Sequence, residues 1–309
     1  MRLLGLHHIT AIASDAKRNV DFYTRVLGLR FVKKTVNFDD PGTYHLYYGD
    51  AGASPGTLLT FFLWDGAPQG RRGAGMTSAI AYSVPADALE FWRERLRAAG
   101  VAMTELPRRF GDAVLAFADP NGIPLELVGT AEPDPRIPAP HAEVPATKGI
   151  RGFHSVTLPV GAGTQTAEVL TRDMTYRLAA KDGVRSRYTV GAGGPGTYVD
   201  LVADPGLPHG RSGVGTVHHV AFRTPDDPGQ AEARNALAAR GFNVSPIMDR
   251  CYFHSIYYRE PGGVLFEIAT DGPGFTIDEP IAQLGRKLML PPWYEANREE
   301  IEARLPRLD

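Results

Sequence analysis

The sequence contains a single cysteine among its 309 residues, and this scarcity excludes a disulfide framework and any cysteine-rich zinc or iron–sulfur site. A surplus of charge is also lacking, since 33 basic residues face 35 acidic ones. A nucleic-acid-binding protein needs a basic excess to neutralise phosphates, and none exists here. No apolar run approaches the roughly 18 residues of a membrane span, and the first residues lack the pattern of a signal peptide. We therefore expect a soluble, cytoplasmic protein that binds neither nucleic acid nor membrane.

What the sequence does contain is one pattern repeated four times. Each unit opens with a strand-like run, continues with a helix-like stretch and closes with about three short strand-like runs. The opening strands are expected at Leu6–Ala13, Thr77–Val84, Gly152–Pro159 and Val217–Arg223, and the helices at Ala16–Leu27, Pro85–Gly100, Thr164–Ala180 and Asp227–Gly241. One such unit leaves a sheet face bare and must bury it against a copy of itself. The sequence predicts an α+β fold, with four βαβββ modules paired into two barrel-like domains.

A proline-rich stretch divides the repeats. The segment Glu132–Thr147 favours neither helix nor central strand, because proline lacks the backbone N–H that both use. We expect an extended surface linker there, an N-terminal pair of modules over residues 1–131 and a C-terminal pair over residues 148–275. Residues 276–309 are expected to form a tail with a helix at Glu295–Leu305.

Two histidine pairs stand at matching places in the first and last units. His7-His8 and His218-His219 lie in the opening strands of those units, and the last closing strand carries Glu267 in an apolar run. Successive strand residues face opposite sides, so one ring of each pair can face inward. Two imidazoles and one carboxylate are the ligand set of non-haem Fe(II) sites with open positions. We expect His8, His219 and Glu267 to bind such a metal in one cavity between the first and fourth units. The alternative to a metal site is that these histidines are ordinary strand residues whose rings form hydrogen bonds.

The other three units lack a complete ligand set. Their closing strands carry Thr60, Glu126 and Asp200 at the places that match Glu267, and Ser155 replaces the ligand histidine in the third unit. The two central units are therefore interpreted as structural.

With these motifs, the four-unit plan resembles the vicinal oxygen chelate superfamily, which includes glyoxalases, fosfomycin-resistance proteins and extradiol dioxygenases. The chain is most similar to the ring-cleaving dioxygenases that act on para-hydroquinones. The stretch Asp249–Phe275 (DRCYFHSIYYREPGGVLFEIATDGPGF) and the tail segment Leu284–Leu305 (LGRKLMLPPWYEANREEIEARL) carry most of this likeness. The resemblance covers essentially the whole chain.

The resemblance implies Fe(II), or alternatively Mn(II), on His8, His219 and Glu267. It also implies a set of supporting catalytic residues, namely His7, Thr10, His218, Arg250 and Tyr257. His7 or His218 could take the proton of a substrate hydroxyl, and Arg250 and Tyr257 could donate hydrogen bonds to a developing oxygen anion. His254 stands where that group would have arginine, and Tyr258 where phenylalanine is usual, so both are expected to shape substrate binding.

The sequence motifs and the resemblance are compatible with three functions. The first is a ring-cleaving dioxygenase with a small aromatic substrate and O2 as its partners. The second is a glyoxalase-like isomerase or thiol transferase, which generally uses more carboxylate or glutamine ligands. The third is a metal-free protein that binds an aromatic compound. Two histidines with one glutamate favour the dioxygenase, and we expect a homo-oligomer, a dimer or larger.

Overall fold

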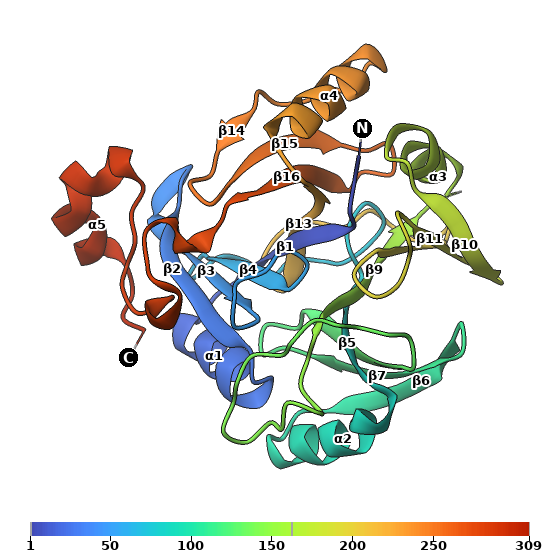
Figure 1. Ribbon diagram of the computed structural model, residues 1–309, viewed down its shortest axis with the longest axis horizontal. Helices are drawn as coiled ribbons and strands as arrows, with labels where there is room; N and C mark the ends of the chain where they lie inside the picture. Colours follow the sequence, from blue (N-terminus) through green and yellow to red (C-terminus); the bar gives the residue numbers. More distant parts are fainter. Residues whose placement is uncertain (1, 162, 309) are drawn as a thin grey trace.

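The computed structural model describes residues 2–161 and 163–308 and contains two curled sheets of eight strands each (Figure 1). The first sheet has the order β14-β15-β16-β13-β1-β4-β3-β2, and the second has the order β10-β11-β12-β9-β5-β8-β7-β6. The strands of the first sheet are β1 (Leu6–Ala13), β2 (Arg30–Asn37), β3 (Asp40–Gly49), β4 (Leu58–Leu63), β13 (Thr216–Thr224), β14 (Met248–Asp249), β15 (Phe253–Arg259) and β16 (Leu265–Pro273). Those of the second are β5 (Ala79–Pro85), β6 (Met103–Arg109), β7 (Asp112–Ala118), β8 (Pro124–Thr130), β9 (Gly152–Val160), β10 (Arg177–Asp182), β11 (Arg185–Thr189) and β12 (Tyr198–Ala203). The predicted α+β class, with two half-barrels, is confirmed.

Each half-barrel joins one module from before the linker with one module from after it. The first combines the first and fourth units through antiparallel pairing of β1 with β13, and the second combines the middle units through β5 and β9. The pairing of consecutive modules within 1–131 and within 148–275 is therefore corrected, whereas the expected meeting of the first and fourth units is confirmed. The apolar pattern shows that such modules must pair. Because all four modules share this pattern, it does not identify which module pairs with which.

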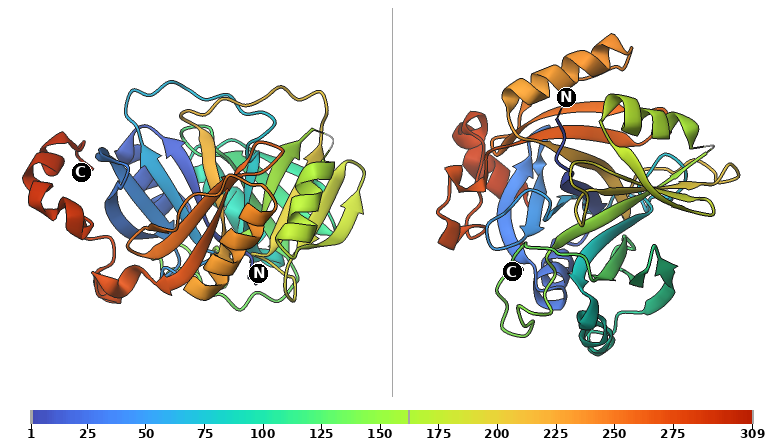
Figure 2. Two further views of the ribbon diagram at one scale, coloured as in Figure 1. Left: turned by 90° about the horizontal axis from the view of Figure 1, so that it is seen from above. Right: turned by 45° about the vertical axis from the view of Figure 1, so that its right-hand side comes forward.

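Two long loops carry the chain between the half-barrels. Residues 64–78 run from β4 to β5, and residues 204–215 run back from β12 to β13 (Figure 2, left). The loops lie side by side and form isolated bridges, including Arg71 with Arg211 and Ala74 with His209. The linker has no helix or strand and crosses between the half-barrels, where Arg136 donates hydrogen bonds to the carbonyls of Gly56 and Phe153.

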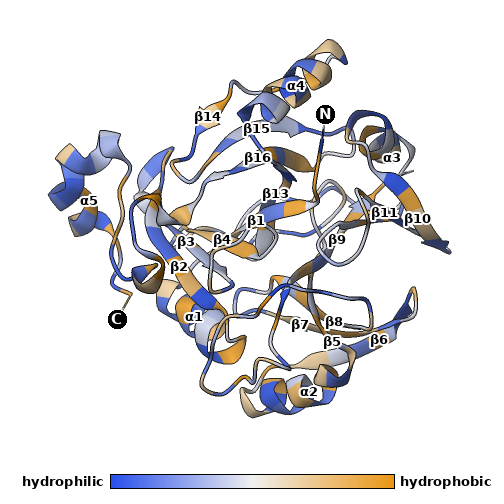
Figure 3. Ribbon diagram, viewed as in Figure 1, coloured by the Kyte–Doolittle hydropathy of each residue, from blue (hydrophilic) through white to orange (hydrophobic). Residues whose placement is uncertain are grey.

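The helices lie on the outer faces of the sheets (Figure 1). They are α1 (Ala16–Asp21) with the π-helical turn η1 (Phe22–Val26), η2 (Ala86–Ala88) with α2 (Leu89–Ala98), α3 (Thr164–Glu168) with the π-helical turn η3 (Val169–Asp173), and α4 (Asp227–Ala239). Helices α2 and α4 carry both apolar and polar residues, as expected where one side packs on a sheet (Figure 3). The helix predicted at Thr164–Ala180 ends earlier, because Thr175 takes a positive φ of 60° and β10 follows.

The tail packs beside the edge strand of the first half-barrel. It contains short turns η4 (Phe275–Ile277), η5 (Ile281–Gln283) and η6 (Pro292–Asn297) and the helix α5 (Arg298–Arg304), close to the predicted helix. Met289 donates a backbone hydrogen bond to Lys34 of β2, so the tail continues that edge. None of the helices in the described residues combines the length and apolar character needed to cross a membrane.

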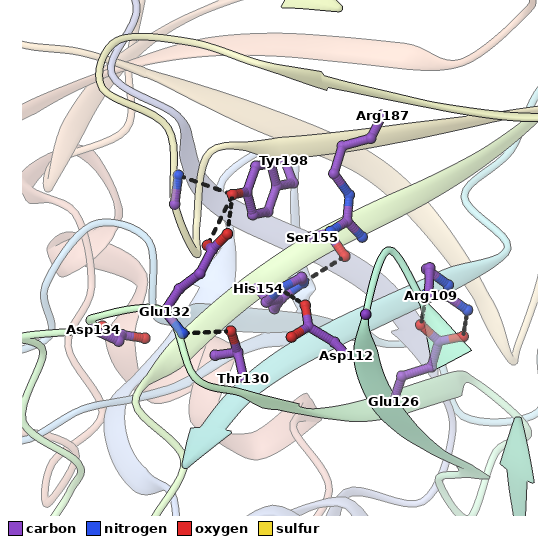
Figure 4. Close-up of polar contacts among 12 residues, drawn as sticks. Arg109, Asp112, Glu126, Thr130, Glu132, Asp134, His154, Ser155, Arg187 and Tyr198 are labelled. Carbon is purple, nitrogen blue, oxygen red and sulfur yellow. Dashed lines mark hydrogen bonds and ion pairs between the residues drawn. The ribbon is translucent and has the colours of Figure 1, made fainter. Parts of the chain in front are cut away.

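Buried ion pairs lie in the second half-barrel, and Figure 4 shows the one between Arg109 and Glu126. Arg109 forms two hydrogen bonds to Glu126, of 2.6 and 2.8 Å, and Arg187 forms two to Asp200, of 2.8 and 3.0 Å. Arg185 adds a further contact to Asp200 at 3.1 Å. These guanidinium groups neutralise the two carboxylates, which agrees with the structural role expected for the central units.

Replacing Asp200 should destabilise the protein strongly. Its side chain is 0% exposed, and Asp200→Ala would leave Arg187 buried without its carboxylate, a change that costs about 3–5 kcal/mol. Asp182→Ala, on the exposed edge strand β10, is the control and should change stability by less than about 0.5 kcal/mol. Urea unfolding followed by circular dichroism measures both. Equal stabilities of the two variants would contradict a structural role for the ion pairs.

Candidate metal centre

Three adjacent strands of the first half-barrel bring His8, His219 and Glu267 together. His8 lies on β1, His219 on its neighbour β13 and Glu267 on β16, which is the next strand along. The Nε2 atoms of the two histidines are 3.3 Å apart, and they lie 3.3 and 3.0 Å from Oε2 of Glu267. All three side chains are buried. Within the residues that the structure describes, no other group of histidine, cysteine or acidic side chains is arranged to hold a metal.

A hydrogen-bond chain fixes the protons of the first histidine pair. Nε2 of His7 lies 3.1 Å from the carbonyl oxygen of Thr270, which can only accept, so this nitrogen carries the proton. Nδ1 of the neutral His7 ring is then an acceptor, and it lies 2.9 Å from Nδ1 of His8. His8 must therefore carry its proton on Nδ1, which leaves Nε2 with a free electron pair toward Glu267.

The second histidine pair repeats this contact. Nδ1 of His218 lies 2.8 Å from Nδ1 of His219. Burial and the neighbouring His219 lower the pKa of His218 to about 3, so its ring is neutral at pH 7. In the arrangement that matches the first pair, His218 accepts the hydrogen bond and His219 keeps a free electron pair on Nε2.

The carboxylate is prepared for a cation in the same way. Ser255 donates a hydrogen bond to Oε1 of Glu267, whereas Oε2 is buried without any hydrogen-bond partner among the described residues. Three electron-pair donors that converge without a shared proton fit a divalent metal ion, which removes their mutual repulsion.

A small cavity of about 30 Å³ opens beside His8 and His219. Its walls combine aromatic rings with polar groups that come from several strands and from the turn between β2 and β3. The lining residues are His8, Asn37, Phe38, Asp39, His45, Tyr47, Phe62, His219, Arg250, Phe253 and Tyr257.

Arg250 and Tyr257 both face this cavity, as the sequence predicts. Tyr257 lies opposite Glu267 in the pairing of β15 with β16, and Arg250 donates a hydrogen bond of 3.3 Å to its hydroxyl. Burial raises the pKa of Tyr257, so the hydroxyl stays protonated and can donate. Arg250 also forms an ion pair with the exposed Asp39, at 3.0 Å, across the cavity.

The other three supporting residues act from outside the cavity. Both ring nitrogens of His7 are engaged, so its geometry suits holding His8 and not taking a substrate proton. His218 lines a separate hollow with Thr77 and Arg259. Thr10 is buried and hydrogen-bonded to Thr60 at 2.7 Å. His7 and His218 thus contact the two ligand histidines, whereas the Thr10 side chain contacts Thr60.

His254 and Tyr258 do not reach the metal cavity, which corrects the expectation that they bind substrate there. Strand β15 alternates its side chains, and these two residues face away from the side that carries Ser255 and Tyr257. His254 is partly exposed and contacts Asp227 at 2.6 Å. The Tyr258 hydroxyl lies in the core, 3.1 Å from the sulfur of Met174.

Sequence reasoning missed the residues that β2 and β3 contribute to the cavity. His45 and Tyr47 lie on β3, and Asn37 and Asp39 lie at its turn with β2. Their spacing of two residues indicates a shared face of the strand. The sequence gives no sign that this face turns toward the metal ligands.

Comparison with known proteins supports the same assignment. A family model described as "Glyoxalase/Bleomycin resistance protein/Dioxygenase superfamily" matches residues 5–127 and 152–268. The chain is 45% identical over 301 residues to "Putative ring-cleaving dioxygenase MhqO" of Bacillus subtilis, with 97% of this chain and 95% of that protein covered. It is 35% identical over 306 residues to "Chlorohydroquinone/hydroquinone 1,2-dioxygenase" of Sphingobium indicum, with the same coverage of 97% and 95%.

A solved structure has nearly the same fold. The crystal structure of a "putative dioxygenase" from Bacillus subtilis superposes with a TM-score of 0.95 at 44% identity and covers 100% of this chain and 98% of that chain. Full-length similarity to proteins named as ring-cleaving dioxygenases confirms the predicted resemblance and the predicted enzyme class, an oxidoreductase that incorporates O2. The chain belongs to the glyoxalase, bleomycin resistance protein and dioxygenase superfamily.

Proposed function

We propose that the chain is an Fe(II)-dependent, extradiol-type dioxygenase that opens the ring of a hydroquinone or catechol-like aromatic with O2. The observation that carries the proposal is the convergence of His8, His219 and Glu267 on one point beside an aromatic-walled cavity. The name of the Sphingobium indicum relative, a chlorohydroquinone/hydroquinone 1,2-dioxygenase, supports the hydroquinone class. A cytoplasmic location and a homo-oligomer stay predictions of the sequence.

His8, His219 and Glu267 would hold the metal, for which we propose Fe(II), with Mn(II) as the alternative. Two imidazoles and one carboxylate leave coordination positions open, as non-haem iron oxygenases require. When bound, the metal supplies Lewis acidity for the substrate oxygen and electron exchange with O2. A glyoxalase-like activity would favour a further carboxylate ligand, but no other acidic side chain joins this group in the described residues.

The residues of the cavity would bind and orient the ring. Phe62 and Phe253 offer apolar walls on which an aromatic substrate can pack. Tyr257 and Arg250 would donate hydrogen bonds to a substrate oxygen that carries negative charge, and their mutual contact holds them in place before the substrate arrives. Both side chains are partly buried, and the lower dielectric there strengthens these interactions.

One metal ion per chain is expected, and Glu267 should be required for it. Glu267→Gln removes the charge that balances the metal and should lower metal content strongly. Glu126→Gln is the matched control, because Glu126 holds the corresponding place in the second half-barrel and contacts Arg109. Metal analysis of anaerobically purified protein measures both variants. Full occupancy in Glu267→Gln, or two metal ions per wild-type chain, would contradict the assignment.

Oxygen uptake with hydroquinones and catechols tests the proposed reaction and the role of Tyr257. Tyr257→Phe should lower turnover of hydroquinones roughly tenfold to a hundredfold while the metal stays bound, because one hydrogen bond to a substrate oxygen is lost. Catechols should lose less, since both of their oxygens can reach the metal. Wild-type protein that consumes no oxygen with either class would overturn the proposed function. Equal losses on both classes would assign Tyr257 to the oxygen chemistry.

A further inference from the structure

The two modules of the first half-barrel match residue by residue around the metal ligands. Thr60 lies opposite Thr10 in the pairing of β4 with β1, two residues beyond His8. Glu267 lies opposite Ala221 in the pairing of β16 with β13, two residues beyond His219. Thr60 is therefore the counterpart of Glu267 on the other side of the site.

The residues that flank these two positions correspond as well. Tyr47 lies opposite Thr60 in the pairing of β3 with β4, as Tyr257 lies opposite Glu267. Two residues earlier on each strand stand His45 and Ser255. Ser255 donates a hydrogen bond to Glu267, and Nε2 of His45 lies 2.8 Å from the hydroxyl of Thr60.

The site thus has four corresponding positions, which we call its corners: His8, His219, Glu267 and Thr60. The first three carry groups that can bind a metal. The fourth corner carries the hydroxyl of Thr60 at the centre of a hydrogen-bonded chain. Thr60 contacts Thr10 at 2.7 Å and His45 at 2.8 Å, and Nδ1 of His45 contacts the hydroxyl of Tyr47 at 2.9 Å. All four side chains are buried, and His45 and Tyr47 line the cavity beside His8.

The hydrogen-bonded chain that starts at Thr60 ends at the hydroxyl of Tyr47. Both ring nitrogens of His45 are engaged, so the imidazole itself has no free donor or acceptor for a ligand. The Tyr47 hydroxyl contacts only His45 among the described residues and keeps unused hydrogen-bonding capacity. Because hydroxyls and a neutral imidazole can each reverse their direction, Tyr47 can either donate to an added oxygen or accept from it.

We propose that the Thr60 corner is the substrate-binding side of the metal centre, and that the Tyr47 hydroxyl hydrogen-bonds to an oxygen of the aromatic substrate. His45 and Thr60 are positioning residues that hold Tyr47 ready. Tyr257 and Arg250 would then contact the substrate from one side of the cavity, and Tyr47, held in place by His45, would contact it from the other side. This inference rests on the proposed function, since it takes a phenolic oxygen as the ligand.

Anaerobic binding of hydroquinone to the metal-loaded protein tests the role of Tyr47. Calorimetry should show roughly tenfold weaker binding by Tyr47→Phe, with unchanged metal content, because one hydrogen bond is lost. His45→Gln should weaken binding in the same direction. Tyr48→Phe is the matched control and should bind as the wild type does, because Tyr48 is equally buried but its hydroxyl contacts Asn19 at 2.7 Å, within the core. Wild-type affinity in both Tyr47→Phe and His45→Gln would overturn the inference.

Moving the carboxylate tests the correspondence of the corners without any assay of activity. Glu267→Thr should lose metal to a chelator, and the double variant Thr60→Glu/Glu267→Thr should regain retention, because His45 can donate to a carboxylate there as Ser255 does to Glu267. Thr60→Glu alone should hold metal more tightly and bind hydroquinone at least tenfold more weakly, whereas Thr60→Val should retain metal as the wild type does.

Unchanged metal retention and unchanged hydroquinone binding in Thr60→Glu would overturn the inference. Wild-type protein that binds no hydroquinone would instead overturn the proposed function.

Discussion

The hydrogen bond from His7 to the carbonyl of Thr270 is the contact on which the metal centre depends. It determines which nitrogen of His7 carries the proton, and thereby leaves Nε2 of His8 free of one. Thr270 lies on β16, the strand that also carries Glu267, so the same strand supplies a ligand and orients another ligand two strands away. The arrangement requires β1, β13 and β16 to be neighbours, and only the pairing of the first module with the fourth provides this.

The second half-barrel solves the same problem of buried charge without a metal. By register with the first, its four corners are Ser155, Ala79, Glu126 and Asp200, so two carboxylates remain where both imidazoles are lost. Burying a carboxylate without a positive partner is costly. Arginines from β6 and β11 supply that partner, and the Arg187 guanidinium lies over the rings of Phe110 and Tyr198. A bound metal ion would balance the charge of Glu267, whereas the chain's own arginines balance Glu126 and Asp200.

The sequence alone predicted the repeated modules and the three candidate ligands, because both follow from local patterns. Strand periodicity marks a module, and a histidine pair in matching strands marks a ligand position. Which modules pair depends on contacts between distant segments, and nothing local to Leu6–Ala13 distinguishes β13 from β5 as its partner. His254 was misplaced for a related reason, since it sits near Tyr257 in sequence but an odd number of residues away, on the other face of β15. The sequence did not indicate His45, because its link to the site depends on a contact with Thr60 on the neighbouring strand β4.

The pairing of distant modules also bears on the order in which the protein can be assembled. The second half-barrel uses strands from residues 79–203, a continuous stretch, whereas the first needs residues 6–63 together with residues 216–273. On a ribosome, the middle of the chain can fold while its beginning still lacks a partner. The first module must wait, with an unpaired strand edge, until nearly all of the polypeptide has emerged. The half-barrel that has no metal ligands is thus the one that can form early and hold the two ends of the chain close enough to complete the other.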